Sequence, residues 1–478
     1  MKPGLQILMI CCLLANGFVA RAQIKDSTTL AFLQKDTSAF VQVTSINISG
    51  NKKTKGYIIL REMQFKEGDS IPTFALAQNL QQAHDQVYNT TLFSDVAITP
   101  TFISPTQITI AVVVKEKWYI YPTPQFQLVD RNVNEWIKLH NADLNRVIYG
   151  VKFAHYNFSG RRDQLRVYLL NGYARNISFA YSAPYSNSAL TEGFSVAAGF
   201  TQNREVPYRT TRFNKLQQFN NGDFVRNVFS VSAGYTVRKS FFKKHSYVLS
   251  YTLQNVNDSL LSPRYNPNYY GSPKSHKGYL DMIYSFQYAN TNNINYPLRG
   301  LVYGASVLKR GLEWKGGINM LMLDGYVARY LPHGNNWYSS FQGYVKIKAP
   351  FEQAYINQRA LGYGDLNLRG LEYYVIDGVA ATLGKYTLKK KVWSFGVPVP
   401  FKNRLASRIP FTIFAKTYAD AGYVYSKPEF ESMLNNRFLY SGGFGIDILT
   451  LYDINLKIEY SLNQLGEKGV FLQMRGGF

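Results

Sequence analysis

From about Tyr119 to its end, the chain alternates between apolar and polar residues in segments of about ten residues. In one such segment, Leu165, Val167 and Leu169 occupy every second position. In another, Ile454, Leu456, Ile458 and Tyr460 alternate with Asn, Lys, Glu and Ser. A period of two is typical of a β-strand with two unlike faces. Gly, Asn, Pro and Ser separate the segments, so we predict consecutive antiparallel strands.

Sixteen segments fit this pattern, and an even number suits a closed single-chain barrel. The predicted strands are 119–128, 147–158, 163–171, 174–183, 193–202, 224–238, 246–256, 278–290, 300–310, 316–330, 337–348, 378–391, 411–424, 438–449, 453–461 and 469–478. The longest predicted loops are 129–146, 203–223, 257–277 and 349–377. A soluble sandwich would also alternate. Charged residues recur on the polar face of nearly every strand, which favours a transmembrane β-barrel over 118–478, with a polar lumen and with loop 349–377 folding outward or into it.

The segment 41–117 has a different pattern, which predicts a small α+β domain. A strand around 43–48 stops at Gly50-Asn51, and Gly68-Asp69 separates two helices. Leu92-Phe93 closes the helical part before strands at 94–99 and 107–115. The predicted order is β-α-α-β-β.

The two helices have recognisable starts. Thr54 is predicted to cap the first, which runs to about Met63. Pro72 opens the second. The apolar face predicted for this second helix consists of Phe74, Ala77, Leu80, His84 and Val87.

The N-terminus is predicted to be a secretory signal peptide over 1–22. It has a positive start at Lys2, a short apolar run and an Ala-Arg-Ala cleavage site, so we expect cleavage between Ala22 and Gln23. Residues 23–40 are polar and mixed, and we expect a flexible lead there. Both cysteines lie inside the signal, so disulfides are not expected in the mature chain.

Charge and aromatic content narrow the class of protein further. The net charge is +23, and removing Lys2 and Arg21 with the signal leaves +21. A basic exported chain suits lipid or lipopolysaccharide phosphates better than nucleic acid as an anionic partner. With 37 Tyr and 31 Phe, and without an apolar run of ~18 residues, the composition favours membrane strands over membrane helices.

No catalytic or metal-binding pattern stands out. The six histidines are scattered without ligand spacing, and neither a G-x-S-x-G nor a P-loop motif is present. We therefore expect neither an enzyme nor a cofactor.

The segment 362–378 does not alternate, although alternating segments flank it. It carries Arg369, and a buried arginine needs a carboxylate partner. Asp420, in Tyr-Ala-Asp-Ala-Gly, is a candidate. The alternative is a long surface loop with a solvated arginine.

The segment 41–117 resembles a polypeptide-transport-associated (POTRA) domain. The resemblance lies in Ile-Asn-Ile-Ser-Gly-Asn at 46–51, in Gly68-Asp69, in the stretch 89–96 with Leu92-Phe93, and in Val-Val-Val-Lys-Glu at 112–116. It implies that extended polypeptides bind by adding a strand to the edge of the domain's sheet. The alternative is a spacer domain without a ligand.

The whole mature chain resembles the outer-membrane assembly-factor superfamily, which includes the BamA-like and TamA-like proteins and the two-partner secretion transporters. Besides the POTRA-like domain, the resemblance lies in the opening of the barrel at 149–161, in Tyr-Pro-Leu-Arg-Gly at 296–300, in the tetrad Leu368-Arg369-Gly370-Leu371 and in the terminal Phe478. In the family the fourth residue of the tetrad is aromatic, so Leu371 is a departure.

The resemblance implies roles for several of these residues. The sixth extracellular loop would enter the lumen, where Arg369 would pair with Asp420. Phe478 resembles the C-terminal signal by which barrel precursors are recognised; it also fits an interface aromatic.

The expected function is insertion or translocation of other polypeptides at the bacterial outer membrane, with the POTRA domain in the periplasm. A single POTRA domain favours an accessory paralogue. The expected partners are unfolded outer-membrane polypeptides and lipid phosphates, with room for periplasmic or lipoprotein accessory subunits. Pro122 and Pro124 in the first strand predict a weak seam against the last strand. The alternatives are a passive channel or a surface anchor on the same scaffold.

Overall fold

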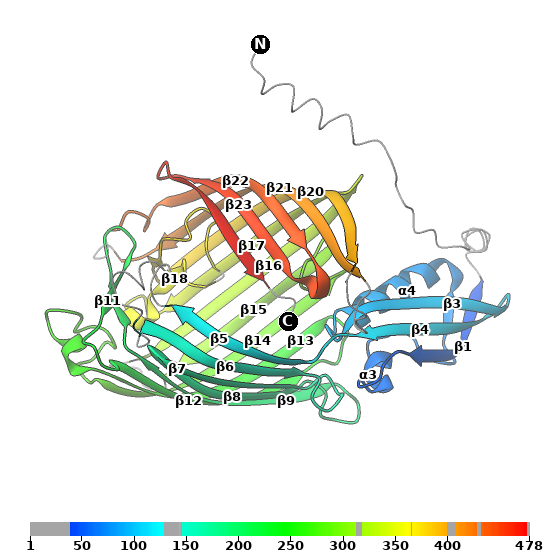
Figure 1. Ribbon diagram of the computed structural model, residues 1–478, viewed down its shortest axis with the longest axis horizontal. Helices are drawn as coiled ribbons and strands as arrows, with labels where there is room; N and C mark the ends of the chain where they lie inside the picture. Colours follow the sequence, from blue (N-terminus) through cyan, green and yellow to red (C-terminus); the bar gives the residue numbers. More distant parts are fainter. Residues whose placement is uncertain are drawn as a thin grey trace, which may run out of the picture.

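The computed structural model describes residues 39–128, 143, 146–311, 318–364, 366–398, 408–427 and 432–475. Figure 1 shows two parts: a small N-terminal domain with helices, and a large curved sheet beside it. The expected signal peptide with Ala22 and Gln23, nearly all of the expected lead, and Phe478 lie outside the described residues.

The N-terminal domain is a four-stranded sheet with two helices. Its elements in chain order are β1 (Phe40–Ser49), α3 (Gly56–Leu60), β2 (Ser70–Pro72), α4 (Thr73–Tyr88), β3 (Phe93–Ser104) and β4 (Gln107–Glu116). The strand order is β2-β1-β4-β3, and only β1 and β4 run parallel. The predicted order therefore lacked β2, whose three residues were too short to show a period. No helix in the described part of the chain is long and apolar enough to cross a membrane.

Both helices bury apolar residues against this sheet. The core includes Ile58, Ile59, Leu76, Ala83, Val87, Leu92, Phe93, Val43, Ile108, Ile110 and Val112. The predicted face of α4 is wrong at Phe74, which is 57% exposed, and at Ala77. The buried stripe instead contains Thr73, Leu76, Ala83 and Val87. Apolar residues lie on two overlapping faces of this helix. The face that packs against the sheet is the one without Phe74.

Two turns of this domain have the geometry that their residues require. Gly50 has φ +87°, and a Cβ there would lie 1.9 Å from the carbonyl oxygen of Val114, so only glycine fits. Asn51 Nδ2 donates to the carbonyl three residues later at 3.0 Å. Gly68 has φ +92°, and Asp69 Oδ2 accepts the amide of Lys66 at 2.8 Å.

The prediction that Thr54 caps α3 is wrong. The N-cap is Lys55, and no side chain caps this helix. Thr54 is buried, and its hydroxyl lies 3.0 Å from the hydroxyl of Tyr119 and accepts from Asn157 Nδ2 at 3.0 Å. The Thr54 side chain therefore contacts residues at the junction with the barrel and does not cap the helix.

Sixteen antiparallel strands form the large sheet, which confirms the predicted number. They are β5 (Ile120–Leu128), β6 (Val147–Tyr156), β7 (Gln164–Gly172), β8 (Ala174–Ala183), β9 (Glu192–Asn203), β12 (Arg226–Val237), β13 (Lys243–Val256), β14 (His276–Thr291), β15 (Gly300–Arg310), β16 (Met320–Gly334), β17 (Trp337–Ala349), β20 (Ala380–Pro398), β21 (Arg408–Tyr425), β22 (Phe438–Leu449), β23 (Asn455–Asn463) and β24 (Lys468–Arg475). Each strand pairs with its neighbours in this order. The largest difference from the predicted ends is the extension of β20 to Pro398, followed by β16, which starts and ends four residues later than predicted.

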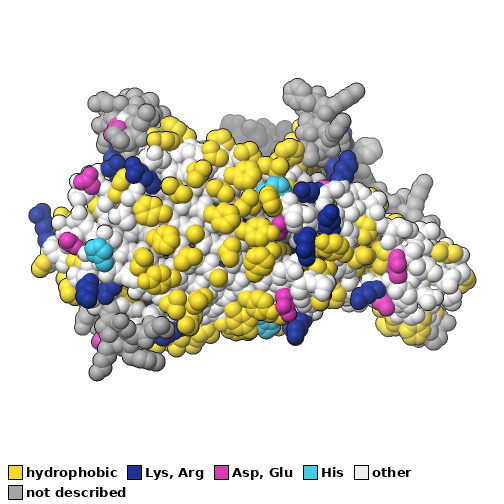
Figure 2. Space-filling view, turned by 90° about the horizontal axis from the view of Figure 1, so that it is seen from below, with side chains coloured by type: hydrophobic (Ala, Val, Ile, Leu, Met, Phe, Trp, Pro, Cys, Tyr) yellow, Lys and Arg dark blue, Asp and Glu magenta, His cyan; other side chains and the backbone are white. Residues whose placement is uncertain are grey.

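The side chains alternate between the outside and the lumen, as predicted. Leu169, Phe179 and Leu249 are exposed on the outside, whereas Glu459 and Asp447 are buried within the barrel. Figure 2 shows apolar side chains over the middle of the visible barrel face and most charged ones toward its two ends. This distribution fits a lipid-facing surface between two aqueous rims.

Within the described part of the chain, no strand pairing joins the first strand of the sheet to the last. Among the described residues, β5 pairs only with β6, and β24 pairs only with β23. The amide of Tyr156 donates to the carbonyl of Tyr119 at 2.8 Å, so the odd-numbered residues of β5 face β6 with their backbone groups. Pro122 and Pro124 are even-numbered and therefore point their backbone nitrogens, which have no hydrogen, at the open edge.

Candidate functional site

The loop between β17 and β20 carries the central contact of the lumen. Asp420 in β21 binds Arg369 through both carboxylate oxygens: Nε donates to Oδ2 at 3.0 Å, and Nη2 donates to Oδ1. The Arg369 amide also donates to Oδ2 at 3.0 Å. In β20, Thr387 Oγ1 accepts from Nη1 at 2.9 Å. The ring centre of Tyr418 lies 4.0 Å from the guanidinium carbon. The two charged side chains are 12% and 0% exposed, so this is a buried bidentate pair.

The residues beside Arg369 hold the loop against the wall. Leu368 and Leu371 are 1% and 2% exposed, and they belong to an apolar cluster with Leu361, Val424 and Leu439. Leu371 therefore fills an apolar site, although the resembling family has an aromatic residue there.

Gly370 lies close to strand β23. Its φ is +86°, and a Cβ there would lie 2.8 Å from Cβ of Ser461 in β23. A larger residue would have to push the loop away from the strand.

The same loop binds the last two strands. Asn463 Nδ2 donates to the carbonyl of Gly370 at 2.8 Å. The hydroxyl of Tyr374 donates to Glu467 in the turn between β23 and β24 at 2.5 Å. The ring of Tyr373 lies 5.4 Å from that of Phe471 in β24. The loop therefore fixes the strand that borders the open edge.

A second set of contacts ties the loop to the segment between β9 and β12. This segment contains the hairpin of β10 (Val206–Thr210) and β11 (Leu216–Phe219). Asp377 in β19 (Ile376–Asp377) accepts from Thr210 at 2.5 Å and from Tyr363 at 2.6 Å. Burial raises the pKa of the Asp377 carboxyl above its ordinary value. Asn214 Nδ2 donates to the carbonyl of Val375 at 3.0 Å.

A network of buried charges lies in the lumen beside Arg369. Lys416 contacts both Asp447 and Glu459, the latter at 2.5 Å, and Lys389 lies 3.4 Å from Asp447. Tyr296, from the segment 296–300 singled out in the sequence, donates to Asp447 at 2.7 Å. These groups line a cavity of about 380 Å³ that also includes Arg369. Nothing in the sequence singles out these charged residues except the recurrence of charges at lumen-facing positions.

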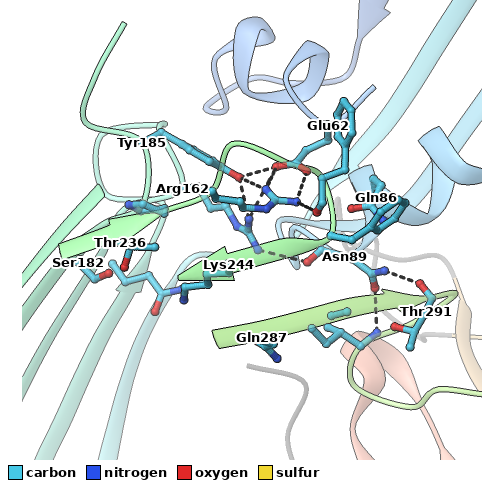
Figure 3. Close-up of a pocket in the computed structure, with 17 residues that line it drawn as sticks. Glu62, Gln86, Asn89, Arg162, Ser182, Tyr185, Thr236, Lys244, Gln287 and Thr291 are labelled. Carbon is cyan, nitrogen blue, oxygen red and sulfur yellow. Dashed lines mark hydrogen bonds and ion pairs between the residues drawn. The ribbon is translucent and has the colours of Figure 1, made fainter. Parts of the chain in front are cut away.

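Glu62 joins the N-terminal domain to three turns of the barrel (Figure 3). Its carboxylate lies 2.6 Å from Arg238 Nη1 and 3.9 Å from Arg162 Nη1, and it accepts from the hydroxyl of Tyr185. The side chain is 1% exposed. Burial opposes its ionisation, but the two guanidinium groups outweigh burial and hold the pKa of Glu62 below its ordinary value. Sequence reasoning missed this residue, because an acid in a turn after a short helix usually faces solvent.

Helix α4 binds two further turns. Asp85 pairs with Arg299 at 2.8 Å. Asn89 donates to the carbonyl of Thr291 at 2.7 Å, as a dashed line in Figure 3 shows. Tyr88 donates to Asp453 at 3.0 Å in the turn between β22 and β23. The domain is therefore docked across the barrel mouth rather than tethered by the chain alone.

Comparisons with known proteins agree with this architecture. Residues 41–117 match the family model described as POTRA, a surface antigen variable number repeat. Among solved structures, CdiB from Escherichia coli is similar at 11% identity and a TM-score of 0.53, over 91% of this chain and 75% of that one. No match was found among the curated proteins.

Two other solved structures were found at lower TM-scores. BamA from Haemophilus ducreyi lacking POTRA domains 1–3 has 14% identity and a TM-score of 0.48, over 91% of this chain and 84% of that one. CdiB from Acinetobacter baumannii has 12% identity and a TM-score of 0.45, over 91% and 73%. The POTRA match over 41–117 and the similarity to CdiB show a POTRA-type domain followed by a sixteen-stranded β-barrel fold.

Proposed function

We propose that this protein inserts or translocates other polypeptides at the bacterial outer membrane, with its POTRA domain in the periplasm. The observation that carries the proposal is that, among the residues that the structure describes, no pairing joins β5 to β24. An unpaired strand edge is a template for pairing with another chain. A strand of the client polypeptide would pair with backbone groups at this edge, while the apolar outer face of the barrel stays in contact with lipid.

The loop around Arg369 supports this proposal over a passive channel. It lies in the lumen, is held by a buried ion pair and is tied to the segment between β9 and β12. A lumen that contains a loop and several buried ion pairs suits a barrel that acts through its edge strands. The surface-anchor alternative gives the open edge no role.

The POTRA domain offers a second pairing edge. In its sheet, β3 lies at one border and pairs with β4 on one side only in the described structure. An extended client would add to β3 before it reaches the barrel. Because the domain is docked on the barrel mouth, a captured chain would already lie close to the open edge.

Crosslinking the two edge strands tests the proposal. The mature chain is expected to have no cysteine, since Cys11 and Cys12 lie in the expected signal, so an introduced pair is the only disulfide that can form. One cysteine replaces lumen-facing Thr123 in β5, and the other replaces lumen-facing Gln473 in β24. The matched control is Lys152→Cys with Tyr168→Cys, two residues that face each other in the β6–β7 ladder.

The assay is insertion of an unfolded outer-membrane β-barrel polypeptide into vesicles that contain the purified protein. We expect oxidation of the seam pair to stop insertion, reductant to restore it, and the control pair to leave it unchanged. Full insertion with a quantitatively crosslinked seam would disprove the role of the edge. Ion conductance, measured on the same vesicles, would then decide whether the barrel acts as a channel.

A further inference from the structure

A cavity of about 340 Å³ lies where the POTRA domain covers the barrel mouth (Figure 3). Its wall on the barrel side consists of lumen-facing residues near the ends of β7, β8, β12, β13 and β14 and of residues in the adjoining turns. Its roof comes from the POTRA domain, through Glu62, Gln86 and Asn89. Neither part forms the cavity alone. Its volume lies in the range of small-molecule sites.

The cavity carries an excess of positive charge. Arg162, Arg238 and Lys244 line it together with a single carboxylate, that of Glu62. Glu62 is already engaged with both arginines. In the described part of the chain, no acidic side chain lies within ion-pair distance of Lys244. An excess of two positive charges therefore faces the cavity, and it matches a phosphate dianion better than a single carboxylate.

Neutral polar groups accompany these charges. Thr291, one of the lining residues, is 3% exposed, and its buried hydroxyl has no hydrogen-bond partner among the described residues. The lumen-facing residues Ser182, Thr236 and Gln287 add hydroxyl and amide groups to the same wall. A buried hydroxyl without a partner costs free energy unless a ligand or water satisfies it.

We propose that this cavity binds a small anion bearing a phosphate group, with Lys244 as its principal ligand. The anion would lie between groups of the POTRA domain and groups of the barrel. Its binding would therefore strengthen the docking of the domain on the barrel mouth. This proposal does not depend on polypeptide insertion, since binding and docking can be measured without a client.

The test is isothermal titration of the purified full-length protein in detergent with inorganic phosphate, comparing the wild type with Lys244→Gln. The matched control is Lys243→Gln, which removes the same charge from the adjacent residue on the opposite face of β13. We expect saturable binding that Lys244→Gln weakens at least ~10-fold and Lys243→Gln leaves unchanged. Equal thermal unfolding of the three proteins would show that both variants fold.

A second titration with soluble dioctanoyl phosphatidylglycerol identifies the source of the phosphate. Binding of both ligands with the same dependence on Lys244 supports a site for the phosphate group itself. Binding of the lipid alone, again dependent on Lys244, supports a headgroup site. Absence of saturable binding of either ligand, or equal losses in both lysine variants, would overturn the proposal. Tight binding of an acidic peptide that depends on Lys244, without saturable binding of either phosphate ligand, would assign the cavity to a polypeptide and would also overturn the proposal.

Discussion

Replacing Arg369 with alanine would leave the carboxylate of Asp420 buried in the lumen without its guanidinium partner. Asp420 is 0% exposed in its side chain and now accepts three hydrogen bonds from Arg369, two from the guanidinium and one from the amide. Breaking a buried pair by removing one partner costs about 3–5 kcal/mol. We expect the loop to release from the wall, because release lets water reach the carboxylate.

The size of this effect can be expressed as an exchange rate. Since ~1.4 kcal/mol corresponds to a factor of ten, amide hydrogen exchange in the segment 366–376 should accelerate by about two to three and a half orders of magnitude. The strand amides of the barrel should keep their protection. Alanine in place of Arg359, an exposed arginine of the same loop, is the matched control and should change exchange by less than about tenfold.

A double-mutant cycle completes the test. Asp420→Ala alone should also release the loop, and the variant with both changes should be less perturbed than the sum of the single variants, because neither charge is then left alone. Unchanged exchange in Arg369→Ala, or additive effects in the double variant, would refute the view that this pair holds the loop.

Three further predictions concern the junction and the loop. Glu62→Gln should weaken the docking of the POTRA domain by about 3–5 kcal/mol, since two arginines lose their carboxylate; spin-label distances between the domain and the barrel should broaden. The pKa of Glu62 is lowered in the folded protein. The contribution of its ionised carboxylate to docking should therefore be complete above the ordinary pKa of 4.5 and lost as the pH falls through the lowered pKa. The same distances should broaden in acid in the wild type and stay unchanged by acid in the variant. Gly370→Ala should destabilise the loop more than Gly364→Ala, because both have positive φ but only Gly370 would bring its Cβ against Ser461; equal exchange in the two variants would show that space at Gly370 is unimportant.

The sequence was sufficient to predict most of the barrel, because alternation acts over many residues in every strand. In the segment 164–171, for example, three leucine and valine positions specify the outer face. The shorter elements were harder to predict, because β2 has only three residues and α3 has only five. On α4 two apolar stripes overlap, and only the position of the sheet decides between them.

The site was predictable only where one residue requires a specific partner. Arg369 in a non-alternating segment required a buried acid, and the structure places it against Asp420. Glu62, Arg162 and Arg238 come from distant parts of the chain, and their proximity depends on how the domain docks. Lys416, Asp447 and Glu459 looked like ordinary lumen-facing charges. Their mutual contacts depend on the register of three adjacent strands, which alternation alone does not specify.

The two prolines of β5 also bear on how copies of this protein behave toward one another. A bare strand edge in a crowded membrane invites identical molecules to join side by side into a continuous ribbon. Pro122 and Pro124 withhold two of the donors that such a union would need, so the edge offers acceptors without matching donors. At these two positions a second copy of the chain would receive no hydrogen bond from this edge, which disfavours continuous pairing between copies.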